Sequence, residues 1–398
     1  MGAGGSVLKK GPAPNTLEFP KPKHQRLKRT RDLSLDDFEQ GVTLGMGSYG
    51  RVRYYEERAS SVPWAIKALR KTQVMRLSQE EHVILECDLL KSLRHPFIVH
   101  CAGSFQSPAY LYLVLDFVPG GTLGTRLRGE GRLGADACRF YAAQCAVVLE
   151  YLHSQKIAYR DLKPDNLLVD LDGHLVLADF GFAKRIADGA RSHTFLGTPE
   201  YISPEMLGEQ GHGLGVDWWA LGVLCYEMFD GEPPFTHEQT MELYHLVLRS
   251  KVRWSRRVQS HGAIQSFLAR LLIKDPDKRA GAHGADEVKL DGFFERLDWR
   301  RLMARELSAP WRPPVVDQTD TSMFDAYPDS DEIAPTPCLG VAEDPFADFG
   351  SSNISTSLER RKRPSDNVSG SPEWEQRRSS VDSEAMGALA MDPPPLSE

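Results

Sequence analysis

Two short segments near the middle of the chain carry acidic and amide side chains at a spacing that suits phosphoryl transfer. Residues 159–166 read YRDLKPDN, and an Asp-Phe-Gly run begins at Asp179, eighteen residues after Asp161. The loose transition state of phosphoryl transfer spreads charge over several oxygens, so an amide and a carboxylate must hold Mg²⁺ while a second carboxylate orients the attacking hydroxyl group. We therefore expect Asn166 and Asp179 to bind Mg²⁺ and Asp161 to accept the hydroxyl proton. Lys163, two residues from Asp161, can stabilise the transferred phosphoryl group.

A glycine-rich loop near residue 45 could cradle phosphate groups. Residues 45–52 follow the pattern G-x-G-x-x-G-x-V, and glycine lets backbone N–H groups approach phosphate oxygens closely. A dinucleotide site would need a helix directly after the loop, whereas a strand-like run follows here, which favours a nucleotide lid. Taken alone, such a loop is more often an ordinary hairpin turn. The loop residues expected at the phosphates are Gly45, Gly47, Ser48, Gly50 and Val52.

Lys67 lies in a strand-like run and could neutralise the charge of the α- and β-phosphates. A lone lysine in a strand is usually a solvated surface residue. Glu86, nineteen residues further on, lies in a helix-like stretch and could pair with Lys67, with Glu80 and Glu81 as competing candidates. Each of these polar residues by itself is more often structural, so it is their joint spacing that favours a phosphotransfer site.

The pattern along the chain predicts two unequal lobes between two extensions. Residues 38–118 contain short β-like runs and one helix-like stretch at 79–93, whereas helical periodicity dominates after the Pro-Gly-Gly break at 119–121. Residues 1–35 form a basic, flexible arm. Residues 351–398 are rich in Ser, Arg and Pro, which predicts disorder.

The composition excludes several classes of protein. The 398 residues carry a formal net charge of −7, which disfavours nucleic acid as a partner. The six cysteines are too scattered for a zinc site and read as reduced thiols. No apolar run reaches the roughly 18 residues that a membrane span needs, and no signal peptide is visible. We therefore expect a cytoplasmic protein, with the nucleus or a membrane surface as alternatives.

At this point the sequence resembles the eukaryotic protein kinases from about residue 38 to residue 349. The runs DFGFAK at 179–184, GTPEY at 197–201 and DWWALG at 217–222 are similar to those of the AGC group. LDDFE at 35–39, FDAY at 324–327 and FADF at 346–349 resemble the catalytic subunits of cAMP-dependent protein kinase.

The resemblance implies an α+β, bilobal protein kinase fold with a small antiparallel β lobe that carries one main helix and a larger, mostly α-helical lobe. It places the catalytic domain at 38–294, divided into lobes at 38–118 and 119–294, and a tail typical of the AGC group at 295–350. It also implies transfer of the γ-phosphoryl group of ATP to Ser or Thr, with ATP and Mg²⁺ as cofactors. Besides the loop residues, Lys67 and Glu86, the ATP-binding positions that it implies are Leu44, Ala65, Asp116, Val118, Leu168 and Phe324.

In this family a residue matching Thr194 is phosphorylated in the activation loop. A phosphate on Thr194 could be bound by Arg160, Lys184 and His82, which would connect the order of this loop to both lobes. The resemblance also implies that Glu205 pairs with Arg279.

Substrate selection is less closely matched. Asp165 and Glu227 occupy two acidic positions that bind basic residues before the phosphoacceptor, but a third acidic position holds Thr122. A hydrophobic pocket for the residue after the phosphoacceptor is expected from Phe195, Pro199 and Ile202.

The implied partners are basic protein substrates and a cyclic-nucleotide-binding regulatory subunit. His193 replaces a tryptophan that contacts that subunit, and Glu232 and Thr236 replace aromatic residues that seat an inhibitor peptide, which argues against standard binding of either. A cGMP-dependent-like kinase or another AGC member, and a pseudokinase scaffold, are the alternative functions.

Three further modification sites are expected. The first residues, MGAGGS, fit N-myristoylation at Gly2, which would allow reversible membrane association, although a plain flexible start has the same appearance. Thr336 resembles a tail phosphorylation site of the group. Ser380, in RRSSV, has the form of a basic-directed substrate of the enzyme itself.

Overall fold

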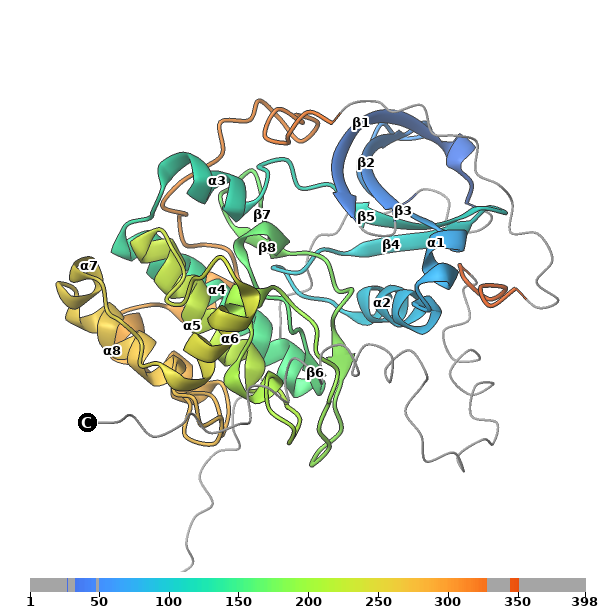
Figure 1. Cartoon of the computed structure of the whole chain (residues 1–398). Helices are drawn as coiled ribbons and strands as arrows, with labels where there is room; N and C mark the ends of the chain where they lie inside the picture. Colours follow the sequence, from blue (N-terminus) through green and yellow to red (C-terminus); the bar gives the residue numbers. More distant parts are fainter. Residues whose placement is uncertain (1–26, 28–32, 48–49, 328–343, 351–398) are drawn as a thin grey trace, which may run out of the picture.

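The computed structural model describes residues 27, 33–47, 50–327 and 344–350. Residues 38–116 form a five-stranded antiparallel sheet in the order β1-β2-β3-β5-β4, with α2 packed against β4 (Figure 1). The helix expected at 79–93 is present as α2. The bounds are η1 Leu35–Asp37, β1 Phe38–Gly47, β2 Gly50–Glu57, β3 Pro63–Arg70, α1 Lys71–Arg76, α2 Glu80–Ser92, β4 Cys101–Gln106 and β5 Tyr110–Asp116.

Residues 123–303 form a second, mostly helical lobe, which confirms the α+β bilobal fold. Its helices are α3 Leu123–Glu130, α4 Ala135–Ser154, α5 Val216–Asp230, α6 Thr240–Arg249, α7 Arg256–Gln259, α8 Gly262–Leu271, α9 Asp286–Lys289 and α10 Trp299–Met303. The short strands and 3-10 turns are β6 Ile157–Ala158, η2 Pro164–Asn166, β7 Leu167–Val169, β8 Leu175–Leu177, β9 Lys184–Arg185, η3 Pro199–Tyr201, η4 Pro204–Met206 and η5 Gly292–Phe294.

Helix α5 is the centre of the large lobe. Thirteen of its fifteen residues are buried, because its sequence is apolar on all sides rather than along one stripe. It packs against α4 and α8, and Asp217 in its first turn is completely buried. The helix is therefore a fixed support from which a charged side chain reaches the loop that follows β6.

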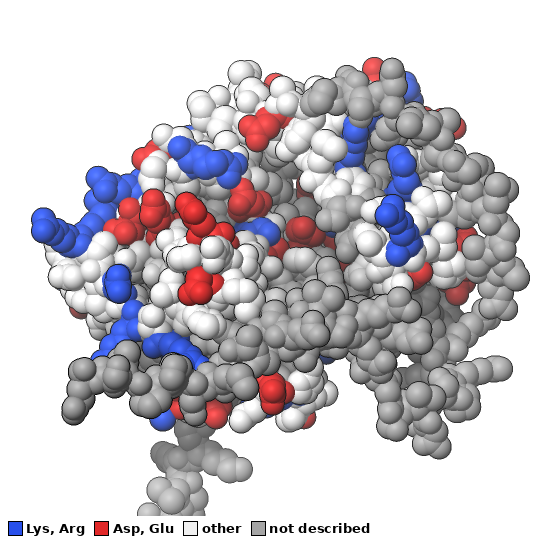
Figure 2. Space-filling model, viewed as in Figure 1, with Lys and Arg blue, Asp and Glu red and all other residues white. Residues whose placement is uncertain are grey.

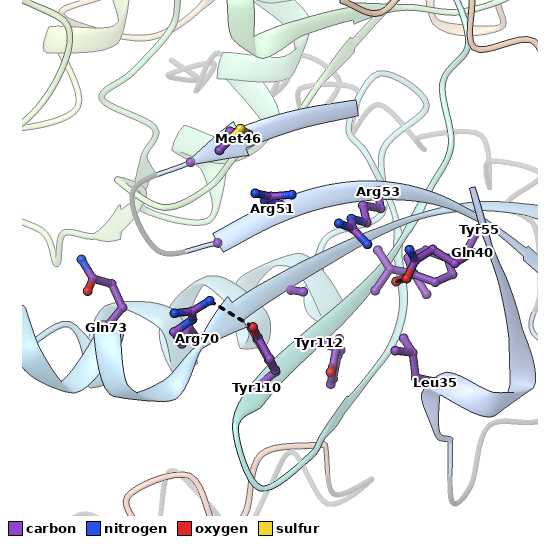
Figure 3. A pocket seen from close by; sticks show the side chains of 14 residues that line it. Leu35, Gln40, Met46, Arg51, Arg53, Tyr55, Arg70, Gln73, Tyr110 and Tyr112 are labelled. Atoms are coloured by element: carbon purple, nitrogen blue, oxygen red, sulfur yellow. Dashed lines mark hydrogen bonds between the residues drawn. The ribbon is translucent and has the colours of Figure 1, made fainter. Parts of the chain in front are cut away.

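Strand β2 supplies two different surfaces, because successive side chains of a strand point to opposite faces. Val52 and Tyr54 lie with Leu44 on the face turned towards the other lobe. Arg51 and Arg53 line a pocket of about 260 Å³ on the outer face, which Figure 3 shows together with the tyrosines of β2 and β5. This outer pocket is separated from Lys67 by the thickness of the sheet.

The segment after α10 runs back along both lobes. Arg126 of α3 lies 4.4 Å from the centre of the Trp311 ring, and the Phe324 ring lies 5.8 Å from the ring of Phe117 beside β5. Further on, Phe346 is 1 % exposed and its carbonyl accepts a hydrogen bond from Gln106 Nε2 at 2.7 Å. Trp311, Phe324 and Phe346 of this segment are therefore packing residues.

The described cysteines are all buried and unpaired, in agreement with reduced thiols; they are Cys87, Cys101, Cys138, Cys145 and Cys225. Cys338 lies outside the described residues. No helix in the described ranges combines the length and the apolar character that crossing a membrane requires.

Gly173 gives a test of how the tail is held. Its φ is +84°, and an added Cβ would lie 1.9 Å from the carbonyl oxygen of Trp311. We expect Gly173→Ala to lower the free energy of unfolding by roughly 2 kcal/mol, because a non-glycine residue is strained there and the tail must also shift. The measurements are urea unfolding and trypsin cleavage at Arg305 and Arg312, which should become faster.

Gly262→Ala is the matched control for this substitution, because an added Cβ on Gly262 at the start of α8 meets nothing within 4 Å. If Gly173→Ala and Gly262→Ala have the same free energy of unfolding, the position of the tail does not depend on the close approach of Gly173 to Trp311.

Candidate active site

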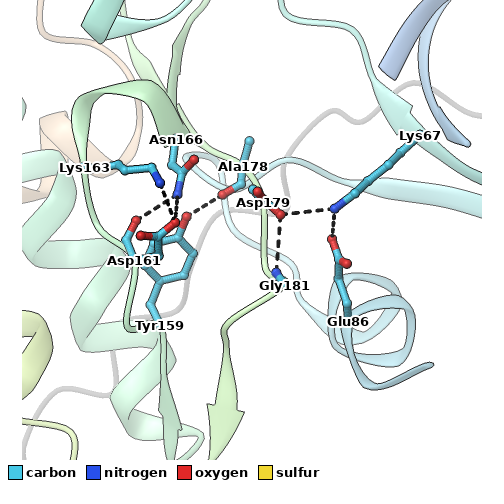
Figure 4. Close-up of polar contacts among 9 residues, drawn as sticks. All are labelled: Lys67, Glu86, Tyr159, Asp161, Lys163, Asn166, Ala178, Asp179 and Gly181. Carbon is cyan, nitrogen blue, oxygen red and sulfur yellow. Dashed lines mark hydrogen bonds and ion pairs between the residues drawn. The ribbon is translucent and has the colours of Figure 1, made fainter. Parts of the chain in front are cut away.

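An ion triad joins the sheet, helix α2 and the large lobe. Lys67 Nζ on β3 lies 2.6 Å from Glu86 Oε1 on α2 and 3.1 Å from Asp179 Oδ1 (Figure 4). Of the three candidate partners in this helix, it is Glu86 that forms the ion pair, whereas Glu80 and Glu81 lie in the first turn of α2. The arrangement fixes the ammonium group at the cleft between the two lobes.

The electrostatics of the triad favour a permanently charged lysine. Burial alone would lower the pKa of Lys67, but Asp179 and Glu86 outweigh it and raise the pKa above its ordinary value. The charge of Lys67 lowers the pKa of Asp179, so that this carboxyl stays ionised at neutral pH. Burial has the opposite effect on Glu86 and raises its pKa.

Three groups hold the carboxylate of Asp161. Asn166 Nδ2 donates to Oδ2 at 2.7 Å, and Lys163 Nζ lies 2.9 Å from the same oxygen. The hydroxyl of Thr198 donates to Oδ1 at 2.9 Å and accepts from Lys163 Nζ at 2.8 Å. Asp161 is 4 % exposed, so one orientation of its carboxylate is strongly selected. Sequence reasoning did not assign a role to Thr198, although it lies in the GTPEY run.

Asn166 and Asp179 lie next to each other and suit a hard divalent cation. The backbone N–H of Ala178, which precedes Asp179, donates to the carbonyl of Asn166 at 2.9 Å. Because the Nδ2 of Asn166 is used by Asp161, its Oδ1 is left for a cation, and Mg²⁺ prefers carboxylate and amide oxygens. Asp179 adopts a φ of +52°, an uncommon conformation typical of residues held in place for function.

The described residues contain no group of three His, Cys, Asp or Glu side chains that would hold a metal alone. Mg²⁺ held through one or two protein groups plus substrate phosphates is the usual arrangement for this ion, and these two residues fit it.

A fully buried carboxylate, Asp217, organises the loop that carries Asp161. It accepts hydrogen bonds from the backbone N–H groups of Tyr159 at 2.9 Å and Arg160 at 2.8 Å, and it lies 2.8 Å from Nε2 of His153. Arg160 has a φ of +70°, and the bonds from Asp217 hold this strained conformation. Sequence reasoning gave Asp217 no role, and only its burial in an apolar helix could have suggested one.

The apolar residues expected around the nucleotide base gather at one place. Val52, Ala65 and Phe324 pack on a cluster formed by Leu44, Tyr54 and Phe117. Val118, two residues after β5, belongs to the main core, and Leu168 on β7 packs against it; Asp116 ends β5 between the lobes. Gly45, Gly47 and Gly50 flank the tip of the loop between β1 and β2, whereas Ser48 lies outside the described residues.

The region around Thr194 is basic. Lys184 Nζ lies 3.4 Å from the hydroxyl of Thr194 and 3.4 Å from that of Ser192, and Arg160 Nη1 donates to Ser192 at 3.3 Å. His82 Nδ1 lies 2.8 Å from Oε1 of Gln79, the residue before α2, and its role at a phosphate on Thr194 stays a prediction. Burial, together with Arg160, lowers the pKa of His212 to about 4, so that its ring adds no charge here at pH 7.

The acidic positions expected at the substrate already have partners. Asp165 Oδ1 accepts from Arg128 Nη1 at 2.9 Å, and Glu227 accepts a hydrogen bond from the hydroxyl of Tyr201. Burial raises the pKa of Glu227. Acidic side chains gather on this face of the large lobe, close to basic ones (Figure 2).

The expected apolar pocket is only partly open. Phe195 is half-buried and its ring meets Tyr244 edge to face, with centroids 5.6 Å apart, and Pro199 is also half-buried. Ile202 is 2 % exposed and belongs to the core, so Phe195 and Pro199 are the two that present surface.

The predicted pair of Glu205 and Arg279 is present. Two guanidinium nitrogens of Arg279 donate to the two carboxylate oxygens of Glu205 at 2.6 and 2.8 Å. Gly2, Thr336 and Ser380 lie outside the described residues, so the modifications expected there stay predictions.

Comparison with known proteins gives a consistent result. The model of the protein kinase domain matches residues 38–290. The cAMP-dependent protein kinase catalytic subunit PRKX of Homo sapiens is 40% identical over 308 residues, which cover 76% of this chain and 85% of the human protein.

Two further relatives are longer than the region they share with this chain. The cAMP-dependent protein kinase catalytic subunit 3 of Drosophila melanogaster is 43% identical over 309 residues, 77% of this chain and 52% of the fly protein. The serine/threonine-protein kinase gad8 of Schizosaccharomyces pombe is 41% identical over 295 residues, 74% of this chain and 52% of its own length. The chain thus spans about half the length of these two relatives.

Asp217 gives a test of how the loop is held. In Asp217→Asn one of the two acceptor oxygens becomes an NH₂ group that faces a backbone donor, that of Tyr159 or that of Arg160. We expect the free energy of unfolding to fall by roughly 1–3 kcal/mol, the cost of a buried donor without an acceptor. Urea unfolding measures this. Asp286→Asn, an exposed position on α9, should unfold like the wild type, and equal stability of both variants would contradict this role of Asp217.

Proposed function

This chain belongs to the protein kinase family and is an ATP-dependent serine/threonine kinase of the AGC type. We propose that it phosphorylates proteins that carry basic residues before the acceptor serine or threonine. We also propose that phosphorylation of Thr194 activates it. The observation that carries the proposal is that Lys67 lies within hydrogen-bond distance of both Glu86 and Asp179. Beside them, the carboxylate of Asp161 is held by Asn166, Lys163 and Thr198.

Each group of the site has a separate task in the reaction. Lys67, held by Glu86, would bind the α- and β-phosphates as a fixed cation. Kinases of this family use ATP and Mg²⁺, and the cation would be held by Asp179 and Asn166 and would neutralise the charge that develops on the phosphates. Asp161 accepts the proton of the substrate hydroxyl, and Lys163, 2.9 Å from it, stabilises the transferred group.

The proposed substrate class rests on two acidic side chains at the edge of the site. Asp165 is half exposed and lies in the 159–166 run beside Asn166, and Glu227 lies on α5 next to Tyr201. Carboxylates at such positions would attract arginine or lysine side chains of a substrate by charge-assisted hydrogen bonds.

We propose that phosphorylation of Thr194 completes the site. A phosphate there adds up to two negative charges beside Lys184 and near Arg160, whose own left-handed backbone conformation is held by Asp217. Since Arg160 directly precedes Asp161, order in the activation loop is transmitted to the catalytic carboxylate.

We also infer weak binding of a standard regulatory subunit or inhibitor peptide. His193, Glu232 and Thr236 are exposed polar residues at the positions where the resemblance predicts aromatic contacts. A cytoplasmic location with reversible membrane attachment through Gly2 completes the proposal.

The assignment of Asp161 is tested by Asp161→Asn, which keeps the shape but removes the proton acceptor. We expect peptide phosphorylation to fall by about 100-fold or more, with ATP binding unchanged, since a positioned base contributes roughly that factor. Asp188→Asn, at an exposed position whose ion pair within the described part of the chain is with Lys156, is the control and should keep full activity. A wild type that bears phosphorylated Thr194 and still does not phosphorylate any peptide would favour the scaffold alternative.

The role of Thr194 is tested by comparing phosphorylated and phosphatase-treated enzyme. We expect phosphorylation to raise kcat by roughly tenfold, because the phosphate gains one or two charge-assisted bonds that order the loop. Lys184→Gln should reduce this gain, whereas Lys278→Gln, exposed and distant in sequence, should not. Equal kcat for both forms of the wild-type enzyme would exclude activation through Thr194.

A further inference from the structure

The acidic substrate position Asp165, on η2, is already paired with an arginine of this chain, Arg128 on α3. Arg128 Nη1 donates to Asp165 Oδ1 at 2.9 Å, and the two side chains are 61% and 55% exposed. Both groups therefore face the solvent from which a substrate approaches. A cation of the protein itself lies where the proposed function places a cation of the substrate.

The local sequence allows this contact at close range. Gly124 lies in the first turn of α3 directly under the ion pair, and an added Cβ would be 2.4 Å from Asp165 Oδ1 and 3.2 Å from Arg128 Nη1. Glycine within a helix costs about 1 kcal/mol relative to alanine. At this position it leaves the space that the carboxylate and the guanidinium occupy.

Two threonines orient Arg128 towards Asp165. The Nη2 of Arg128 donates to the hydroxyl of Thr125 at 3.1 Å, and that hydroxyl lies 3.1 Å from the hydroxyl of Thr122. Thr122 also caps α3 by accepting from the backbone N–H of Thr125 at 2.9 Å. The position where the resemblance predicts a third acidic residue is thus part of a neutral network that supports the arginine.

We propose that Arg128 is a specificity-determining residue that competes with substrate arginine for Asp165. This inference rests on the proposed function, because it assumes that Asp165 faces the basic part of a substrate. An approaching arginine meets a carboxylate that is already paired, and it must displace the guanidinium of Arg128 or lie beside it against like-charge repulsion. Glu227 remains as the second acidic group, so the enzyme favours substrates with a single basic residue over those with two.

The test uses three synthetic peptides of equal length with a serine acceptor and two, one or no arginines before it. Arg128→Gln should lower KM for the peptide with two arginines by about fivefold, since an exposed ion pair is worth at most about 1 kcal/mol. The KM for the arginine-free peptide and the kcat for all three should stay unchanged. A purely structural role of Arg128 would instead change kcat, or change KM for all three peptides equally.

Arg132→Gln is the matched control, because Arg132 is exposed, lies four residues further on, and forms no ion pair with the described residues. The inference would be overturned if Arg128→Gln and Arg132→Gln changed the KM for the two-arginine peptide equally, or if Arg128→Gln raised that KM. In an Asp165→Asn background the effect of Arg128→Gln should disappear, and its persistence there would also contradict competition for this carboxylate.

Asp165→Asn in the wild-type background separates this inference from the proposed function. If that variant has the same KM as the wild type for every peptide, the proposal that Asp165 binds substrate arginine is wrong. If Asp165→Asn raises KM for arginine peptides while Arg128→Gln leaves KM unchanged, the proposed function stands and the competition by Arg128 is rejected.

Discussion

The position of one ammonium group, that of Lys67, constrains the rest of this structure. It is held between a carboxylate on α2 and a carboxylate of the large lobe, at 2.6 and 3.1 Å. Because these two partners belong to different lobes, the triad exists only while the lobes and α2 are correctly placed. The ion pairs outweigh the effect of burial on Lys67, so the group stays charged where a phosphate would bind.

A second layer of contacts keeps the catalytic loop in a conformation that it would not adopt alone. Asp217 accepts hydrogen bonds from two backbone N–H groups of this loop, those of Tyr159 and Arg160, and Arg160 has a positive φ. The apolar surroundings of α5 make this buried carboxylate effective, because hydrogen bonds to a charge are strong where water is excluded. The tail adds further support from outside, through Phe324 near the base site and Phe346 near β4 and α1.

The substrate side of the site differs from this rigid interior. Asp165 and Arg128 are exposed, so their pairing is weak and can be exchanged for contacts with a substrate. Asp161 and Asn166 are buried and held by several bonds each, whereas the selecting groups are exposed and held by few. The proton acceptor Asp161 therefore lies where water is excluded, whereas the selection of a substrate depends on side chains that water reaches.

The sequence alone determined the reaction chemistry and the two-lobed fold. Residue types at fixed spacings, such as Asp161, Asn166 and Asp179, require particular chemistry, and the change from alternating to helical periodicity near residue 119 separates the lobes. The sequence could not choose among Glu80, Glu81 and Glu86, because that choice depends on how α2 is rotated against β4. It also could not show that Thr198 and Asp217 support Asp161, that Ile202 is buried, or that Arg128 pairs with Asp165. These contacts join residues far apart in the chain, so their geometry follows from the packing of whole elements and only the tertiary structure decides it.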